Sequence, residues 1–158
     1  RIREKVPVRA GKRNRKLLKK ADRKEYPGIQ GACKMIKLTK EQVVSIHSSL
    51  IKASGGTDGV RDEGLLESAL ESPFQTFDGH DLYPSIIQKA ARIGYSLVSN
   101  HSFIDGNKRI GIHIMLVFLA INGIDISCTQ EDLIKIGLSL ADGTMTFEEL
   151  SAWLSSHN

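Results

Sequence analysis

Beyond residue 35, apolar residues recur every three or four positions, which is the spacing of one helix face. Six segments follow this pattern, and most of them begin at Thr, Asp or Pro, residue types that favour helix starts. The predicted helices run from the Thr39 cap to Gly55, from the Asp62 cap to Pro73, from Pro84 through Val98, from Asn107 to Ile121, from Thr129 to Ala141 and from Thr146 to Ser155. The pattern therefore predicts a mainly helical, all-α fold.

The fourth predicted helix is the most apolar part of the chain. Between Ile110 and Ile121 apolar residues occupy every face, interrupted by His113. A helix that is hydrophobic all round is surrounded by other elements. We therefore expect a helical bundle packed around this segment. The stretch PFQTFDGHDLYP, residues 73–84, has an Asp-Gly turn signal between aromatic and aliphatic residues and predicts a small β-hairpin or flap.

Charge divides the chain at Met35. Residues 1–34 hold 13 Lys and Arg against 3 Asp and Glu, whereas residues 35–158 hold 9 against 15. Dense like charge with few apolar residues predicts a poorly ordered, basic N-terminal extension. It is open whether this extension is a remnant of an upstream reading frame, a fused segment, a segment that docks on the acidic domain, or a tail without a role. Because aromatic residues other than Tyr26 are missing from it, direct nucleic-acid binding is disfavoured.

Several protein classes are disfavoured by the composition. Cys33 and Cys128 are far apart and form no C-x-x-C pair, so neither a disulfide framework nor a zinc site is indicated. The apolar run from Ile110 to Ile121 is shorter than the ~20 residues that a membrane-spanning helix needs. The start of the chain does not resemble a signal peptide. We expect a cytoplasmic protein with no membrane contact.

The segment HSFIDGNKR, residues 101–109, places polar chemistry directly before the apolar helix. A helix start exposes unpaired N–H groups and attracts phosphate, and a glycine there lets the phosphate approach the backbone. Asp105 is an oxygen ligand suited to Mg²⁺, and His101 can accept a proton near neutral pH. Phosphoryl and nucleotidyl transfer require these parts. We expect Phe103 and Ile104 to anchor the loop in the core.

Each of these residues also has an ordinary structural interpretation. Asp-Gly is a common turn, Asn107 is a good N-cap, and a histidine before an apolar helix is often merely hydrogen-bonded. However, Lys108 and Arg109 at a helix start oppose the helix dipole, at a cost of about 0.3–1 kcal/mol each without an anion. That unfavourable placement favours a ligand.

The pattern His-x-Phe-x-Asp-Gly-Asn-Lys-Arg resembles the signature of the Fic/Doc superfamily, and its Lys-Arg ending resembles the Doc (death on curing) branch. The likeness extends over residues 35–158 and includes MIKLT, GVRDEGLLESALESPFQTFDGHDLYPSI, AARIGYSLVSN and FLAINGIDISC. It implies a Fic/Doc-type helical bundle. It also implies a toxin that transfers the γ-phosphate of ATP to a threonine of elongation factor Tu, halting translation, and a cognate antitoxin whose C-terminal segment occupies a groove.

The resemblance assigns roles to individual positions. His101 is the implied general base, Asp105 the implied Mg²⁺ ligand, and the implied phosphate-binding set is Gly106, Asn107, Lys108 and Arg109, the last two also counted as catalytic. The possible substrate flap comprises Thr76, Phe77, Asp78, Gly79, His80, Asp81 and Leu82. Arg61 can contact the nucleotide or form a surface ion pair. His113 is expected to be a core residue, and His47, His80 and His157 are expected at the surface.

Two positions depart from the longer Fic pattern. Lys108 stands where that pattern has a second glycine, and Ile112 stands where it has a second arginine. Both departures disfavour transfer of AMP, the reaction that the Fic pattern implies, because a side chain replaces the close backbone approach and one phosphate contact is lost. Two alternatives to the phosphate-transferring toxin stay open at this point: a Fic-type AMP-transferase, and an inactive module that binds only the antitoxin.

Overall fold

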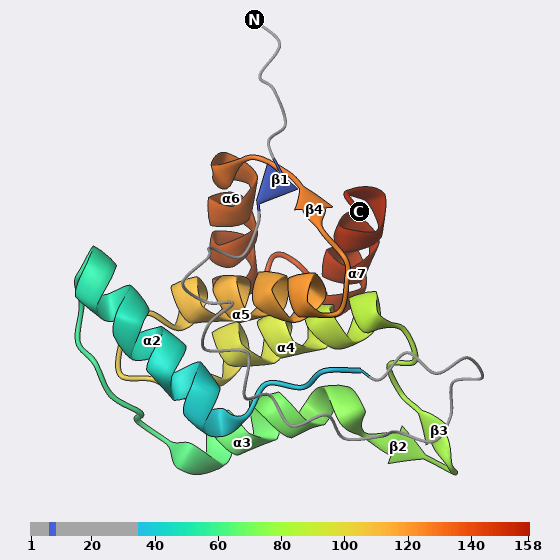
Figure 1. Cartoon of the computed structure of the whole chain (residues 1–158), viewed down its shortest axis with the longest axis horizontal. Coiled ribbons are helices and arrows are strands. Elements are labelled where there is room, and N and C mark those ends of the chain that lie inside the picture. The colour runs from blue at the N-terminus through green and yellow to red at the C-terminus, as the bar shows by residue number, and fades with distance from the viewer. Residues whose placement is uncertain (1–6, 9–34) are drawn as a thin grey trace, which may run out of the picture.

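Helix α5 (Asn107–Ile121) forms the centre of the fold in the computed structural model, which describes residues 7–8 and 35–158 (Figure 1). All residues from Ile114 to Leu119 are buried, as the apolar pattern predicts. The other helices of the described part are α2 (Lys40–Ser54), α3 (Glu63–Glu71), α4 (Ile86–Asn100), α6 (Gln130–Ala141) and α7 (Phe147–Ser156). The prediction of a mainly helical bundle around this helix is confirmed.

Helices α4 and α5 lie side by side and are joined by a short loop, residues 101–106 (Figure 1). Two glycines permit their close approach. A Cβ atom at Gly111 would lie 2.5 Å from Cγ2 of Val98, and one at Gly94 would lie 2.9 Å from Sδ of Met115. Since neither position has room for a side chain, this contact fixes both ends of the connecting loop.

The helix starts follow the predicted capping residues with one exception. Thr39, Thr129 and Thr146 each form a capping box with the residue three positions later, and Asp62 accepts a hydrogen bond from the N–H of Leu65. The third helix was predicted to start at Pro84. It starts at Ile86 instead, because the Ser85 hydroxyl accepts from the N–H of Gln88 and makes Ser85 the cap.

The predicted hairpin is present. Strand β2 (Thr76–Phe77) pairs antiparallel with β3 (His80–Asp81) after a 3-10 helix, Ser72–Phe74. The turn residues Asp78 and Gly79 both have positive φ angles, 50° and 75°, as an Asp-Gly turn requires. A second pair of short strands, β1 (Pro7–Val8) and β4 (Ile126–Ser127), is also antiparallel.

The start of the domain is tied to the end of α5. The N–H of Ile36 donates to the Asn122 side chain (2.9 Å), and the Asn122 amide donates back to the carbonyl of Ile36 (3.0 Å). The domain boundary at Met35 stays a prediction. The predicted lack of order in residues 1–34 lies outside the described residues, apart from the backbone of β1. Within the part of the chain that is described, none of the helices is both long and apolar enough to span a bilayer.

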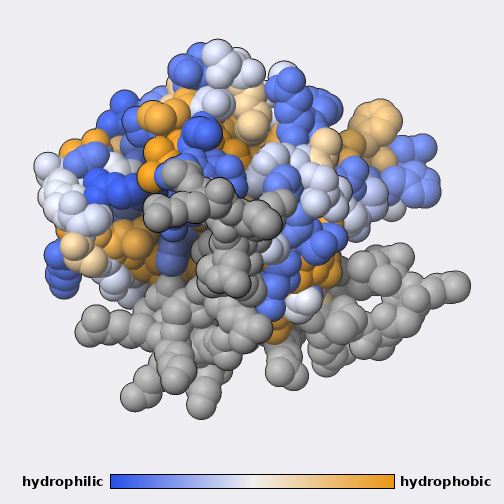
Figure 2. Space-filling model, turned by 90° about the horizontal axis from the view of Figure 1, so that it is seen from above, coloured by the Kyte–Doolittle hydropathy of each residue, from blue (hydrophilic) through white to orange (hydrophobic). Residues whose placement is uncertain are grey.

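The surface seen in Figure 2 is mainly hydrophilic, with apolar patches between the polar side chains. Large apolar side chains that are exposed in the described residues are Leu65, Phe77, Leu82, Ile104, Ile134 and Leu138. Ile104 therefore does not anchor its loop in the core as predicted, because its side chain is 54% exposed. Phe103 alone does so, with 1% of its surface exposed.

Candidate active site

His101, directly after helix α4, has a backbone conformation that residues other than glycine rarely adopt. Its φ and ψ angles are 50° and 45°, in the left-handed region, and the residue is exposed. Such a backbone costs on the order of 1–3 kcal/mol and persists only where the surroundings enforce it. Arg61 supplies part of that enforcement, because its Nε donates to the His101 carbonyl (2.8 Å). Arg61 is thus placed to position His101 through its guanidinium, a role outside the two alternatives given by the sequence.

Backbone pairing holds the loop after His101 against a second loop, residues 55–62. The Ser102 carbonyl accepts from the N–H groups of Arg61 (2.8 Å) and Asp62 (3.1 Å), and the N–H of Ile104 donates to the carbonyl of Gly59 (3.0 Å). A β-bridge between Val60 and Phe103 completes the pairing. The loop that carries the signature is therefore fixed by a segment 40–45 residues earlier in the chain.

Asn107 fastens the same loop from the other side. Its side chain accepts from the N–H of Phe103 (2.9 Å) and donates to the carbonyl of Phe103 (3.0 Å). It does not cap α5; the cap position is Gly106, with a φ of 77°, which has no side chain that could cap the N–H groups of the first turn. The start of α5 thus keeps N–H groups available for an anion, and the amide of Asn107 serves the loop.

The Asp105 carboxylate lies beside that helix start. It accepts from the N–H of Gly106 (2.6 Å) and of Thr57 (3.2 Å), and Arg109 lies 3.8 Å away. The Thr57 and Gly106 N–H groups, with a smaller effect of the Arg109 charge, lower the pKa of Asp105 below its ordinary value. The carboxylate is about half exposed and ionised at neutral pH.

Asp105 has the chemistry of a Mg²⁺ ligand but stands alone in that role. The described residues contain no group of three His, Cys, Asp or Glu side chains that could hold a metal. A single carboxylate suits Mg²⁺, which is commonly held by one or two carboxylates together with substrate phosphates and water. The donor set therefore fits a metal that arrives with a phosphorylated ligand.

Arg109 reaches back from α5 to the end of α2. Its guanidinium donates to the carbonyl of Gly55 (2.7 Å) and to the hydroxyl of Ser54. Gly56 packs closely between the Asp105 carboxylate and the Arg109 guanidinium. A Cβ atom at this position would lie 2.5 Å from Oδ2 of Asp105 and 3.0 Å from Nη2 of Arg109. Lys108 is exposed at the first turn of α5. Two cations thus flank the helix start, as predicted.

His47 is part of this site, which sequence reasoning missed. It was expected at the surface, but only 1% of it is exposed. Its ring stacks on Phe103 with centroids 4.0 Å apart, and Nε2 lies 2.7 Å from the carbonyl oxygen of Asp105. Nδ1 lies 3.2 Å from Oδ1 of Asp58. The helical stripe of residues 43–51 does not reveal this, because the partners are 11 and 58 residues away.

The other histidines lie away from this loop. His80 is exposed on the hairpin, and His157 is half-buried and stacks on Trp153, with centroids 4.1 Å apart. His113 is half-buried on α5, and burial lowers the pKa of its imidazole. His113 therefore lies at the edge of the core and not within it.

The hairpin of residues 76–82 lies at the opposite end of α4 from His101 (Figure 1). Lys89, in the first turns of α4, anchors it: Nζ donates to the Asp81 carboxylate (2.8 Å) and to the carbonyl of Pro73 (3.3 Å), and only 2% of the Lys89 side chain is exposed. From Lys89 to His101 the helix rises by about 18 Å, at 1.5 Å per residue. The hairpin and the histidine therefore belong to different regions of the surface.

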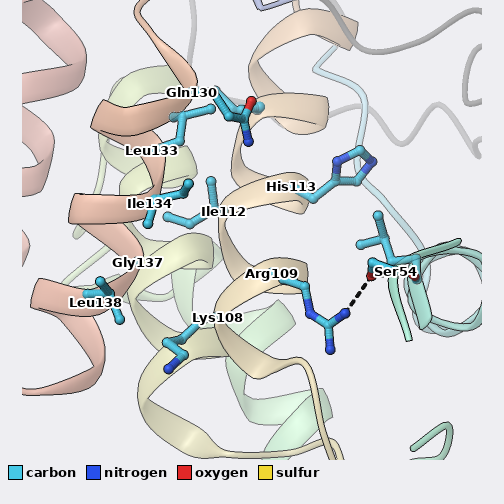
Figure 3. Close-up of a pocket in the computed structure, with 12 residues that line it drawn as sticks. Ser54, Lys108, Arg109, Ile112, His113, Gln130, Leu133, Ile134, Gly137 and Leu138 are labelled. Carbon is cyan, nitrogen blue, oxygen red and sulfur yellow. Dashed lines mark hydrogen bonds between the residues drawn. The ribbon is translucent and has the colours of Figure 1, made fainter. Parts of the chain in front are cut away.

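An apolar groove of about 400 Å³ begins at Lys108 and Arg109 and runs between α5 and α6 (Figure 3). Ile112 and Leu116 of α5 face Leu133, Ile134 and Leu138 of α6 across it, and Leu50 and Ser54 of α2 line it as well. Gly137 of α6 also lines the groove, and a Cβ atom there would lie 3.5 Å from Cγ1 of Ile112. Ile112 is 8% exposed and contributes only apolar surface where the Fic pattern has an arginine.

Taken together, these features define a helical protein in which an exposed histidine, a carboxylate and two cations surround the uncapped start of a buried helix. A model of the Fic/DOC family matches residues 37–119, and the chain belongs to this family.

Two relatives refine the comparison. The chain is 41% identical to Toxin Doc of Mycolicibacterium smegmatis over 90 residues, which cover 57% of this chain and 67% of the relative. It is 24% identical to Protein kinase doc of Escherichia phage P1 over 114 residues, which cover 72% of this chain and 89% of the relative. Both relatives are of the Doc branch, as the Lys-Arg ending of the signature predicts.

Proposed function

We propose that this protein is the toxin of a toxin–antitoxin pair and transfers the γ-phosphate of ATP to a threonine of elongation factor Tu. The observation that carries the proposal is the exposed His101 beside an uncapped helix start at which Lys108 replaces the glycine of the Fic pattern. The names of the two relatives, a toxin and a protein kinase, support it. The choice of elongation factor Tu rests on the resemblance to the Doc branch.

The proposed reaction is an in-line displacement at phosphorus. The threonine oxygen forms a bond to the γ-phosphorus as its proton passes to the His101 ring, and the bond from the γ-phosphorus to the bridging oxygen breaks, which leaves phosphothreonine and ADP. The start of α5, with Lys108 and Arg109, binds phosphate oxygens. Asp105 would hold Mg²⁺, which supplies charge neutralisation at the phosphates when it is bound.

The hairpin can take part only if the substrate segment is long enough. An extended chain rises about 3.3 Å per residue, so about six residues span the ~18 Å between the level of Lys89 and His101. We propose that a target segment of at least this length pairs with the hairpin edge while its threonine lies at His101. A shorter peptide would react without help from the hairpin.

We propose that the antitoxin occupies the groove between α5 and α6. The groove is mainly apolar, Ile134 and Leu138 at its rim are about half exposed, and it opens at Lys108 and Arg109. A bound apolar segment with an acidic end would therefore cover the phosphate-binding residues. Ile134→Glu should abolish neutralisation by the co-expressed antitoxin without loss of toxicity, and unchanged neutralisation would place the antitoxin elsewhere.

Labelled ATP separates the proposed function from its two alternatives. The protein is incubated with purified elongation factor Tu, or with bacterial lysate, and with ATP labelled at the α or the γ position. Label from the γ position alone on the factor supports the proposal. Label from the α position supports AMP transfer, and no label from either position supports an inactive binding module; both results overturn the proposal.

Histidine variants test the assigned base. His101→Ala should lower the transfer rate by about 10²–10⁴-fold, the usual contribution of a general base. Since His101 is exposed, the melting temperature should change little. His157→Ala, which removes a histidine from the far end of α7, is the matched control and should keep the transfer rate. Equal rates for both variants would show that His101 is not the base.

A further inference from the structure

The peptide unit between Asp105 and Gly106 lies at the centre of the candidate site. Its N–H, from Gly106, donates to Oδ1 of the Asp105 carboxylate (2.6 Å), so the orientation of this unit also orients the carboxylate. Its carbonyl oxygen, from Asp105, points to the other side and accepts from Nε2 of His47 (2.7 Å). The two groups belong to one rigid plane.

Gly106 makes this plane easy to rotate. Its φ is 77°, and a glycine passes between positive and negative φ at little cost. A flip of the 105–106 peptide would turn the Gly106 N–H away from the carboxylate and would turn the carbonyl into the space where α5 starts. A carbonyl oxygen there would repel an incoming phosphate. A residue outside the loop must therefore hold the 105–106 peptide in its observed orientation.

His47 is the only described side chain that bonds to this carbonyl. Because a carbonyl can only accept, Nε2 carries a hydrogen. The ring is 1% exposed and held by two further contacts: it stacks on Phe103, and its Nδ1 faces the Asp58 carboxylate, which Ser48 also contacts (3.0 Å). An aliphatic residue would fill the same space without the cost of burying two polar nitrogens. The polar ring therefore has a purpose beyond packing.

We propose that His47 is a positioning residue, which locks the Asp105–Gly106 peptide in the orientation that aims the Asp105 carboxylate and keeps the start of α5 open to phosphate. The inference rests on the proposed function for what the locked loop does, but the lock itself can be measured without any reaction. His47 acts from α2, across 58 residues of sequence, and touches no reacting atom.

Three substitutions at position 47 separate the contribution of the stacked ring from those of its Nε2 and Nδ1 contacts. His47→Phe keeps an aromatic ring on Phe103 and removes both polar contacts. His47→Gln places an amide N–H near the position of Nε2 and retains the bond to Asp105. His47→Asn places its amide near the position of Nδ1 and retains only the contact to Asp58. The melting temperature of each variant shows whether it is folded before other measurements are compared.

Hydrogen exchange of the Gly106 amide is the first readout and needs no substrate. In His47→Phe and His47→Asn this amide should exchange at least tenfold faster than in the unmodified protein, and His47→Gln should restore the rate to within about threefold. If the Gly106 amide exchanges equally slowly in the folded Phe and Asn variants, His47 does not lock this peptide and the inference is overturned, whatever the protein catalyses.

Phosphate transfer is the second readout. Loss of a residue that orients a metal ligand typically costs 10–100-fold in activity or metal affinity. The Phe and Asn variants should therefore lose about that much in kcat and need about tenfold more Mg²⁺ for half-maximal rate, and the Gln variant should recover both. If Gln fails as Phe does while its Gly106 amide stays protected, the lock has no part in the reaction. If the unmodified protein transfers no phosphate, the proposed function fails and the exchange result alone decides on the lock.

Discussion

The signature loop, residues 101–106, and the hairpin, residues 76–82, lie at opposite ends of α4 and are held in different ways. The hairpin has its own Asp-Gly turn and is anchored by one buried lysine nearby in the chain, Lys89 of α4. The loop is held by residues far away in the chain, because His47 and the 55–62 segment bond to it directly. Arg109, at the start of α5, adds a bond to the carbonyl of Gly55. Under the proposed function, many long-range contacts would keep the phosphate-binding loop still, whereas a hairpin that only pairs with the substrate would need few.

Crowding at Gly56 offers the sharpest way to break the loop while sparing the hairpin. In Gly56→Ala the new methyl would overlap Oδ2 of Asp105 at 2.5 Å, at a φ of 121°. Displacement of a site residue by about 1 Å can cost roughly 100-fold in rate, and we expect a transfer loss of that size. Transfer assays with γ-labelled ATP measure it.

Gly55→Ala is the matched control. Its φ is also positive, 82°, but nothing lies within 4 Å of a Cβ atom there. It should cost about 1–3 kcal/mol in the free energy of unfolding, because its ψ of 165° places it in a region that is almost restricted to glycine, and leave transfer within about threefold. Equal loss of transfer in both variants would mean that backbone strain, and not the contact with Asp105, is what matters.

The second largest effect is expected from Asn107, which binds both backbone groups of Phe103. Asn107→Ala leaves a part-buried N–H and carbonyl without partners, and should lower the free energy of unfolding by about 1–3 kcal/mol. Urea titration measures this. Asn100→Ala loses a single exposed bond to Leu65 and should cost less than half as much; similar costs would show that Asn107 does not fasten the loop.

The hairpin should respond in the opposite way, by moving without destabilising the fold. Lys89→Met removes a buried charge and frees Asp81, which is about half exposed and can be hydrated. Removal of one partner of a fully buried ion pair is strongly destabilising, but the freed Asp81 carboxylate is hydrated here, so we expect a change within about 1 kcal/mol in the free energy of unfolding. Hydrogen exchange of residues 76–82 should rise at least fivefold. Protection that stays unchanged would mean that the turn alone holds the hairpin.

The smallest effect concerns acid stability. The Thr57 and Gly106 N–H groups lower the pKa of Asp105 in the folded protein, so this carboxylate stabilises the fold above its ordinary pKa of 3.8, and the stabilisation is lost as the pH falls through the lower folded value. Asp105→Asn should therefore flatten the fall in melting temperature below about pH 4. Asp142 lies away from the site, and hydrogen bonds from Thr144 lower its pKa. Asp142→Asn therefore tests whether the loss of any such aspartate flattens the fall in melting temperature.

Local sequence pattern was enough for the helices, most of their caps and the hairpin, because each depends on residues within about five positions of one another. The buried state of α5 followed from its uniform apolar character. The tethers of the loop could not be predicted, since nothing near His47 indicates that its ring meets a carbonyl 58 residues later. Ile104 was mistaken for a core residue because hydrophobicity alone does not tell which of two neighbouring side chains turns inward. The three glycines at 55, 56 and 59 were a usable signal, since positive φ angles clustered in a short loop indicate close approach of another segment.

The length of helix α4 sets the distance between the hairpin and His101. Its first turns hold the hairpin through Lys89 and its last residue is followed at once by His101. One residue inserted between them would advance the histidine by about 1.5 Å and swing it by about 100° around the helix axis. The helix has little freedom to absorb such a change, because Gly94 and Gly111 press it against α5. Under the proposed function, the number of residues in α4 would therefore set the distance along the substrate chain between the segment that pairs with the hairpin and the target hydroxyl.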